Sequence, residues 1–343
     1  MVRNAAKHAD AGSRSTCSTQ FEIWSPSRIH CDSVVLVQPN RLVAALAGDR
    51  GSGRCMHRSH TKRLMASAVA SPDAWADTYR QFILSDFPAD MRTVLMLCYY
   101  RNFAVPSIAQ TLADAGGIAT DPMKRSVDTA LILFELIAAS FEGTRADHVI
   151  GPLTRVHLTR VHRNGPGGND DYLYVLLSLL VVPIRWVQRH GWRALSAAEV
   201  EAATAFYREL GHRTGLRGLP DSYEAADGLY ARSELARVRP SDEGCAPKTM
   251  TISIIKSRMP GLIRPIAQPL LSTWIDDEAM TDALGSPRGG RALRRVNYGV
   301  LRVRNATTRR RRRPITSPFQ PGLSGSAQYP DGYEVPDLGP RAR

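Results

Sequence analysis

The amino-acid sequence predicts an all-α protein, and three observations support that prediction. Helix-start signals recur along the chain, apolar residues recur at helical spacing in long segments, and the alternation typical of strands is almost absent. The 343 residues include 43% hydrophobic and 22% charged residues, which is an ordinary globular balance. We therefore predict one large helical domain over residues 71–285, flanked by an N-terminal and a C-terminal segment of different composition.

The first 70 residues are rich in Ser, Arg, His and Cys and show no sustained helical or strand periodicity. We predict that residues 1–70 are either disordered or a mis-assigned start, with Met65 as the alternative start.

Helices are expected to begin where a capping residue or a proline precedes an amphipathic pattern. Ser71-Pro72-Asp73 opens the pattern AWADTYRQFIL. Pro106 opens a helix, SIAQTLADA, that Gly116-Gly117 would end. Asp121-Pro122 opens a long helix through MKRSVDTALILFELIAASF, whose apolar residues recur at helical spacing.

The segment from Tyr172 to Ile184 is apolar on nearly every face, which is typical of a helix at the centre of a bundle. Ser196 and Glu199 form a capping-box pattern that opens a further helix, EVEAATAFYREL. Residues 249–258, TMTISIIKSR, alternate well enough for a strand, although a helix fits their surroundings better.

Several polar residues near the central helix are expected to serve structure rather than chemistry. Asp170 and Asp171 stand at its start, where carboxylates meet the positive end of a helix dipole. Four residues toward its other end are expected to clamp helix ends together: Arg185, Trp186, Trp192 and Arg193.

The formal charge of +13 resembles that of a nucleic-acid-binding protein until its location is considered. No acidic residue lies between Asp282 and Asp331, while eleven arginines do, so these arginines account for all but two of the excess positive charges. The run Arg309–Arg313 contains no aromatic residue on which a base could stack. Nucleic acid is therefore not an expected partner, and residues 286–343 are predicted to be a basic C-terminal extension of the helical domain.

The five cysteines are scattered without C-x-x-C spacing, which argues against a disulfide framework and favours a reducing compartment. No stretch reaches the roughly 18 apolar residues of a membrane span, and the first residues lack the apolar region of a signal peptide. We therefore expect a cytoplasmic protein.

Four blocks of sequence carry a resemblance to a known family. They are DTYRQFILSDFPADMRTVLMLCYYRNFAVPSIAQTLADAGG (77–117), KRSVDTALILFELI (124–137), RVHRNGPGGNDDYLYVLLSLLVVPIRWVQRHGWRALSAAE (160–199) and YPDGYEVPDLGP (329–340). In this order they are similar to the catalytic domain shared by bacterial latex-clearing (rubber) oxygenases and the fungal mycophenolic-acid B oxygenases.

The resemblance implies a mostly helical catalytic domain that encloses a b-type haem. It also implies an enzyme that uses O₂ to cleave carbon–carbon double bonds in isoprenoid chains. The expected partners are therefore an apolar isoprenoid or terpenoid substrate and O₂.

His162 matches the iron ligand of the family, because it follows an Arg-containing helix and precedes Asn169-Asp170. Arg160 is a further predicted haem-binding residue. His157 is the alternative ligand, since RVHLTRVH is nearly a duplication and the match could be out of register. Five residues apart, the two histidines lie about 140° apart on an α-helix, so one of them must be idle. From the residues alone, a histidine bonded to solvent or a carbonyl is the competing interpretation.

Arg125, Asp128 and Thr129 are predicted to face one cavity, because they stand at i, i+3 and i+4 on one helix. They match the family's Arg-x-x-(Lys or Asp)-Thr pattern on the distal side of the haem. The resemblance implies that Arg125 neutralises a haem propionate or polarises oxygen, and that Thr129 donates a hydrogen bond to it. Rubber oxygenases carry lysine where this chain has Asp128, which puts polymeric rubber in doubt as the substrate. The competing interpretation is an Arg125–Asp128 ion pair on the helix surface.

Two other functions stay open at this point. One is a non-catalytic helical protein that binds an isoprenoid or lipid, and the other is a basic nucleic-acid-associated protein. The run Arg309–Arg313 is interpreted as a solvated flank or as a contact with an anionic membrane surface, where each basic residue adds about 1 kcal/mol. Peripheral membrane attachment is therefore the alternative to a purely cytoplasmic location.

Overall fold

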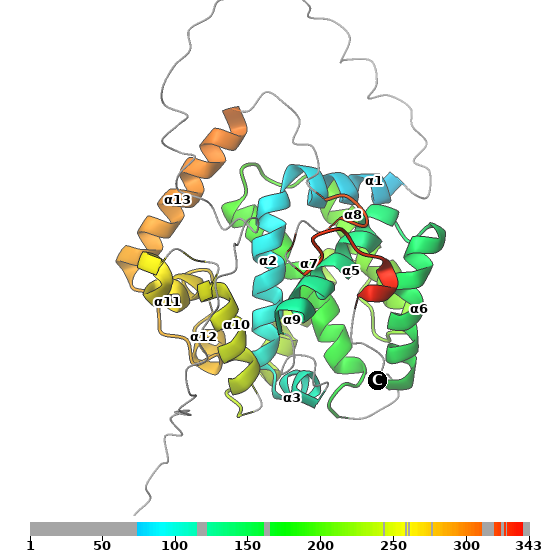
Figure 1. Cartoon of the computed structure of the whole chain (residues 1–343), viewed down its shortest axis with the longest axis horizontal. Coiled ribbons are helices and arrows are strands. Elements are labelled where there is room, and N and C mark those ends of the chain that lie inside the picture. The colour runs from blue at the N-terminus through cyan, green and yellow to red at the C-terminus, as the bar shows by residue number, and fades with distance from the viewer. Residues whose placement is uncertain are drawn as a thin grey trace, which may run out of the picture. The chain divides into compact units, whose positions relative to one another are not determined.

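Recurring helix-start signals and apolar stripes produce an all-helical arrangement in the computed structural model (Figure 1). The structure describes residues 74–114, 122–160, 165–242, 244–257, 259, 261–275, 277–310, 319–323, 326 and 328–338. Among these residues there is no β-strand, and an isolated bridge joins Gln320 to Leu323. The prediction of an all-α fold is confirmed.

The helices are joined by mostly short connections. In chain order they are α1 (Ala74–Arg80), the π-helix η3 (Gln81–Asp86), α2 (Pro88–Arg101), the 3₁₀-helix η4 (Asn102–Ala104), α3 (Pro106–Asp114), α5 (Pro122–Ala139), α6 (Gly143–Arg160), α7 (Asn169–His190), α8 (Ala197–Arg213), α9 (Tyr223–Arg237), α10 (Cys245–Ser257), the 3₁₀-helix η5 (Gly261–Ile266), α11 (Ala267–Ser272), α12 (Glu278–Ala283), α13 (Arg291–Arg310) and the 3₁₀-helix η6 (Val335–Asp337). Residues 249–257, for which a strand was the alternative, belong to α10.

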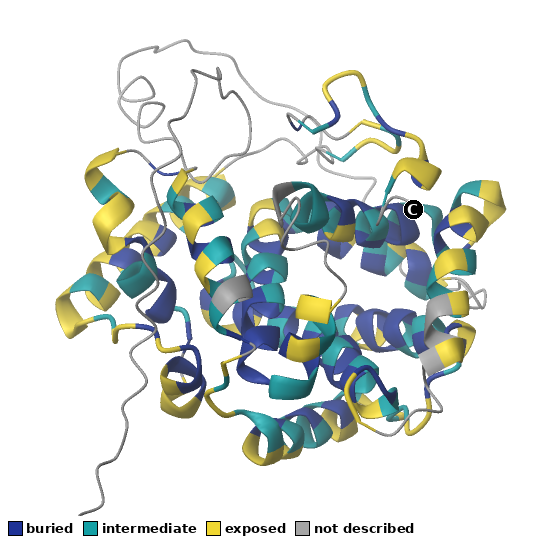
Figure 2. Ribbon diagram, turned by 60° about the horizontal axis from the view of Figure 1, so that its bottom comes forward, coloured by how far each residue is buried: buried dark blue, intermediate teal, exposed yellow. Residues whose placement is uncertain are grey.

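Helix α7 is the centre around which its neighbours pack. Leu177, Val181 and Ile184 on this helix are completely buried. Helices α2, α8 and α9 pack against α7, and buried residues line the surfaces where the helices face one another (Figures 1 and 2). Each such aliphatic side chain contributes about 1.5–3 kcal/mol when it is removed from water. The predicted central helix is thus confirmed.

The helix starts follow the sequence signals wherever the structure describes them. Helix α3 begins at Pro106 and α5 begins at Pro122, as predicted. At the start of α8, the Glu199 amide donates to Ser196 Oγ, and the Ser196 amide donates to the Glu199 carboxylate at 2.8 Å. The predicted capping box is therefore formed. The signals at Ser71–Asp73, Gly116-Gly117 and Asp121 lie outside the described residues.

The ends of α7 are fastened by side chains, as the sequence indicated. At its start, the Asp171 carboxylate accepts hydrogen bonds from the Gly167 amide at 2.8 Å and from Ser107 Oγ at 2.7 Å. Toward its end, Trp186 Nε1 donates to Asp90 at 2.8 Å. Just beyond it, the Arg193 guanidinium binds the carboxylate of Asp86 at 2.5 Å. These contacts join α7 to α2, α3 and η3.

None of the described helices is both long enough and apolar enough to cross a lipid bilayer.

The last residue of α7, His190, lies between aromatic rings. Its imidazole centroid is 4.7 Å from that of Trp186 and 5.0 Å from that of Tyr298 on α13. Burial lowers the pKa of His190 to about 4, and the positive charge of Arg189 adds to that effect. The folded protein therefore holds this imidazole in its neutral form.

Because the pKa of His190 is lower in the folded than in the unfolded chain, the unfolded chain binds the proton first as the pH falls. This contribution to stability is complete above the ordinary pKa of about 6.5 and is lost as the pH falls toward 4. We expect His190→Phe, which keeps an aromatic ring, to lose less thermal stability than the wild type over this range. Calorimetric melting temperatures at several pH values measure this loss of stability. The control is His212→Asn, which changes an exposed histidine. Melting temperatures that fall in parallel with pH in the wild type and in His190→Phe would contradict the prediction.

Candidate functional site

Helix α5 carries all three residues of the predicted polar cluster, and it is covered differently on two faces. On one face, Leu133 and Leu136 are 8% and 1% exposed and belong to the main core. On the other face, Asp128 and Glu135 are each 1% exposed and lie beneath the C-terminal residues Tyr329 and Tyr333. We call these the inner and outer faces of α5.

Arg125 and Thr129 lie at the start of the inner face. Thr129 stands seven residues before Leu136, which places the two only about 20° apart around the helix. Thr129 is nevertheless exposed and Arg125 is half-buried, whereas Leu136 is buried. Among the described residues, the inner face is therefore packed against the core in its second half and open in its first half.

One aromatic residue of α2, Tyr99, lies near this open part of α5. Burial raises the pKa of the Tyr99 phenol, and the positive charge of Arg125 opposes that rise, so the two side chains are within electrostatic range. The Tyr99 ring meets that of Phe103 edge to face at 5.1 Å. The cation on the open half of the inner face thus has the Tyr99 ring nearby, and Phe103 packs on that ring.

The Thr129 hydroxyl is engaged within its own helix. Thr129 Oγ1 donates to the carbonyl oxygen of Arg125 at 2.9 Å. A hydroxyl has one proton to donate and two lone pairs that accept. In this rotamer the Thr129 proton is already used, so the hydroxyl must rotate before it can donate to any other group.

Asp128 is directed to the outer face rather than to the open half of the inner face. Its carboxylate accepts hydrogen bonds from Lys124 Nζ at 2.7 Å and from the Tyr329 hydroxyl at 2.6 Å. The ion pair that the sequence suggested for Asp128 with Arg125 is formed here with Lys124. Arg125 and Thr129 thus lie on the open half of the inner face, whereas Asp128 is buried on the outer face. A catalytic role for these three residues stays a prediction.

A second buried carboxylate on the outer face was not identified from the sequence. Glu135 accepts hydrogen bonds from Arg145 Nε at 2.7 Å, from the Tyr333 hydroxyl at 2.5 Å and from the Gly322 amide at 3.0 Å. Asp128 and Glu135 stand seven residues apart and so lie on one stripe of α5, which was the available signal. We call these two carboxylates with Tyr329 and Tyr333 the C-terminal latch.

A buried ion pair joins α2 to α9 and was also missed. Arg101 and Glu234 are 9% and 8% exposed, and the Arg101 guanidinium bonds both the Glu234 carboxylate and the Tyr230 hydroxyl. Burying an arginine costs free energy unless a carboxylate accompanies it, so neither partner can be removed alone without a large penalty. Arg101 was visible in the block YYRNFAVPSIA, but its partner lies far away in sequence.

The alternative iron ligand, His157, and Arg160 belong to the last turns of α6, which packs against α5. Their side chains lie outside the described residues. His162 lies outside them as well. Ligation by His162, with His157 as the alternative, and haem contact by Arg160 therefore stay predictions.

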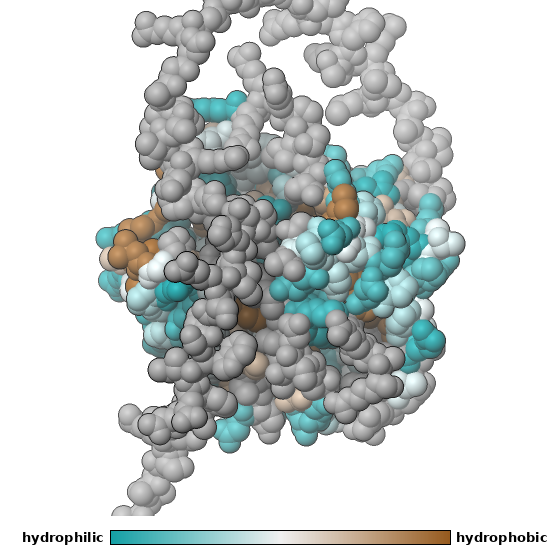
Figure 3. All heavy atoms as spheres, in the orientation of Figure 1, coloured by the Kyte–Doolittle hydropathy of each residue, from teal (hydrophilic) through white to brown (hydrophobic). Residues whose placement is uncertain are grey.

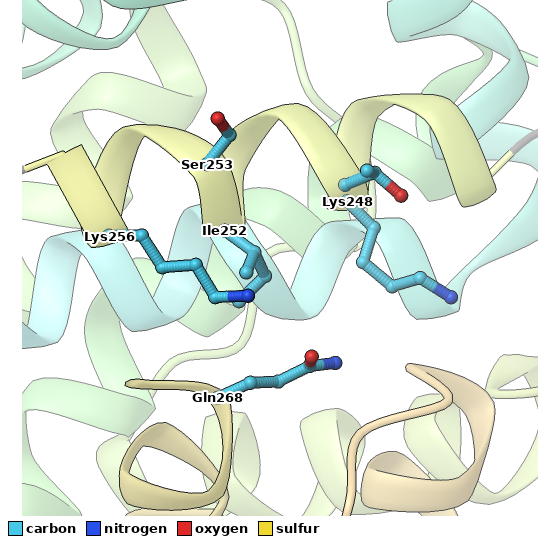
Figure 4. A pocket seen from close by; sticks show the side chains of 6 residues that line it. Lys248, Ile252, Ser253, Lys256 and Gln268 are labelled. Carbon is cyan, nitrogen blue, oxygen red and sulfur yellow. The ribbon is translucent and has the colours of Figure 1, made fainter. Parts of the chain in front are cut away.

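Two cavities that the described residues form lie elsewhere. One of about 250 Å³ lies between α10 and α11 (Figure 4) and is lined by Lys248, Thr249, Ile252, Ser253, Lys256 and Gln268. The other, of about 510 Å³, is lined by Asp77, Arg80, Gln81, Leu84, Ser85, Ala138, Phe319 and Pro321. Neither contains a residue of the predicted site.

Some of the described residues have the chemistry that a haem site needs. A haem iron takes only one or two ligands from the protein, and its propionates favour arginine partners. The open half of the inner face supplies Arg125, the Thr129 hydroxyl and the nearby ring of Tyr99. Among the described residues, no group of three His, Cys, Asp or Glu is placed to hold a metal ion.

Comparisons with known proteins place this chain among oxygenase domains. A family model described as "ER-bound oxygenase mpaB/B'/Rubber oxygenase, catalytic domain" matches residues 87–309. That range includes every predicted site residue and most of α13.

Individual relatives are more distant. The ER-bound oxygenase mpaB' of Penicillium brevicompactum is 23% identical over 206 residues, which cover 56% of this chain and 48% of the relative. The ER-bound oxygenase mpaB of Penicillium roqueforti is 22% identical over 206 residues, which cover 56% of this chain and 69% of the relative. The match thus spans about half the length of the first of these relatives.

A solved structure shares the fold. The structure of latex clearing protein LCP in the closed state superposes with a TM-score of 0.52 at 17% sequence identity. The superposition covers 74% of this chain and 71% of that chain.

The C-terminal latch should open when Glu135 loses its charge. Burial raises the pKa of Glu135, but the hydrogen bonds from Arg145, Tyr333 and the Gly322 amide outweigh burial and hold that pKa below 4.5. The latch is therefore complete at neutral pH and weakens as the pH falls below 4.5. We expect Glu135→Gln to weaken it already at neutral pH, so that amides 328–338 exchange about tenfold faster or more.

Hydrogen–deuterium exchange with mass spectrometry measures this effect. Glu142→Gln, which neutralises an exposed carboxylate just after α5, should leave the exchange unchanged. Equal exchange of residues 328–338 in the wild type and Glu135→Gln would show that the latch does not hold the C-terminal segment.

Proposed function

Because the chain belongs to the mpaB/B' and rubber oxygenase catalytic-domain family, we propose that it is a haem b-dependent oxygenase. Its reaction would be the O₂-dependent cleavage of a carbon–carbon double bond in an isoprenoid or other apolar substrate. The observation that carries this proposal is the family match over residues 87–309, which contains the open half of the inner face of α5. The proposed location is the cytoplasm, with peripheral contact to a membrane.

The proposed cofactor supplies an iron centre that activates O₂. His162 would bind that iron through a neutral imidazole, with His157 as the alternative, and Arg160 would contact the haem. Arg125 would hold a propionate by charge-assisted hydrogen bonds, because its guanidinium is half-buried on the open part of α5. Rings such as Tyr99 and Phe103 would help to exclude water from the reactants.

Thr129 would orient a polar atom of the reactants by a hydrogen bond. In the structure its proton is donated to the Arg125 carbonyl, so the hydroxyl first turns outward by rotation about its side-chain bond. Its exposure leaves room for that rotation. Thr129→Val would remove this hydrogen bond with little change in volume.

The surroundings of Asp128 favour a small apolar substrate over polymeric rubber. Rubber oxygenases resemble this chain but carry lysine at that position, whereas Asp128 is buried beneath Tyr329 with its charge paired to Lys124. Asp128 therefore supplies no amine to the open half of the inner face. A short isoprenoid or terpenoid is the substrate class that we propose.

The absorption spectrum tests the cofactor and its ligand together. Protein from haem-supplied cells should show a Soret band, and His162→Ala should abolish it by removing the axial imidazole. His157→Ala and the control His212→Ala should keep the band and the oxygen consumption with short isoprenoids.

Each other outcome has a distinct meaning. Loss of the band in His157→Ala alone would move the ligand to the alternative position. A spectrum unchanged in both variants would remove both assignments. A colourless wild type that still binds isoprenoids would favour the non-catalytic lipid-binding function over the oxygenase.

A further inference from the structure

The outer surface of α13 carries an apolar stripe that the rest of the described protein leaves uncovered. Val296, Val300 and Val303 are 64%, 51% and 51% exposed. Their spacing of four and three residues places them on one side of the helix. A folded protein rarely exposes a regular stripe of this kind without a partner for it.

The orientation of this stripe is set by polar contacts from other sides of α13, which lie about 80–180° around the helix from Val296. Asn297 Nδ2 donates to Thr273 Oγ1 at 2.6 Å, and Asn305 Nδ2 donates to the His190 carbonyl at 2.7 Å. Arg304 Nη2 donates to the buried Asp90 carboxylate at 2.6 Å. Because these contacts bind other sides of α13 to its neighbours, the valines are left on an outward-facing side of the helix.

The apolar surface continues onto η5. Leu262 is 92% exposed and Ile266 is 41% exposed. Both η5 and α13 pack against helix α11. Figure 3 shows hydrophobic atoms gathered at the left of the molecule, where Figure 1 draws this region. Five of the seven large apolar side chains that the described part exposes thus belong to η5 and α13.

Positive charge flanks this apolar surface. Helix α13 contains no acidic residue, and its exposed arginines are Arg291, Arg294, Arg295, Arg302, Arg309 and Arg310. Arg295 and Arg302 lie about 100–120° around the helix from Val296. The nearby acidic residues of α12, Glu278 and Asp282, are paired with Arg288.

We propose that α13 and η5 form a docking surface for an anionic lipid bilayer, with Leu262, Ile266, Val296, Val300 and Val303 in contact with the acyl boundary. The arginines would meet the lipid phosphates and carboxylates beside that boundary. An apolar stripe flanked by basic residues is the arrangement of helices that lie in the bilayer interface. A nucleic acid would be attracted by the arginines but would leave the valines exposed to water.

This surface is independent of the proposed oxygenase function, since no residue in it belongs to the candidate site. If that function holds, docking would bring the enzyme to the phase in which apolar substrates dissolve.

Flotation of the full chain with vesicles tests the proposal. Binding is expected to vesicles of phosphatidylcholine with phosphatidylserine, and weaker binding to phosphatidylcholine alone. Val296→Ser combined with Val300→Ser should lower the partition coefficient about tenfold or more, because less apolar area leaves water. Arg295→Gln combined with Arg302→Gln should lower it about 25-fold on anionic vesicles at low salt, at about fivefold for each charge.

Matched control substitutions lie on α9. Leu235→Ser removes an apolar side chain that is 88% exposed, and Arg232→Gln removes an exposed arginine. Both variants should float like the wild type, and circular dichroism should show that all variants fold. Absence of vesicle binding, or binding that the α13 variants leave unchanged, would overturn the proposal. It would equally be overturned if the wild type were a dimer that Val296→Ser dissociates, because the surface would then join two copies of the chain.

Discussion

The burial of two carboxylates on α5 is the constraint on which the surroundings of the candidate site depend. Asp128 and Glu135 are each 1% exposed, and a buried carboxylate is tolerated only when charges and hydrogen bonds compensate for its lost hydration. Here the compensation comes from Lys124, Tyr329, Tyr333 and Arg145. The C-terminal residues must therefore lie across the outer face of α5 whenever both carboxylates are charged.

This arrangement leaves α5 with little freedom to rotate. Its outer face is held by the C-terminal latch, and Leu133 and Leu136 on its inner face are held by the main core. Arg125 and Thr129 are then presented from a rigid helix on the part of the inner face that the described residues leave open. Groups that bind a cofactor or orient reactants work best when the surrounding packing fixes their positions in advance. The latch and the core therefore position the proposed site without forming part of it.

The sequence predicted the features that depend on neighbouring residues. The proline starts of α3 and α5, the capping box at Ser196 and the apolar centre of α7 are local patterns, and each is present. The C-terminal latch could not be predicted in this way, because Asp128 and Tyr329 are 201 residues apart. The single cavity predicted for Arg125, Asp128 and Thr129 was based on spacing alone. Arg125 and Asp128, at i and i+3, differ by about 60° around the helix. That angle is enough to place them on different faces of α5.

The central claim is the proposal that a bound haem covers the open half of the inner face of α5 at Thr129. Labelling of Thr129→Cys by a thiol reagent tests this claim most directly, when the modified peptide is quantified by mass spectrometry with and without bound haem. Fast labelling without haem and about tenfold or greater protection with haem is the predicted result, because a thiol covered by a bound group reacts only when that group leaves. Ser253→Cys, on the exposed surface of α10, should react equally in both states. Equal labelling of Thr129→Cys with and without haem would contradict the account.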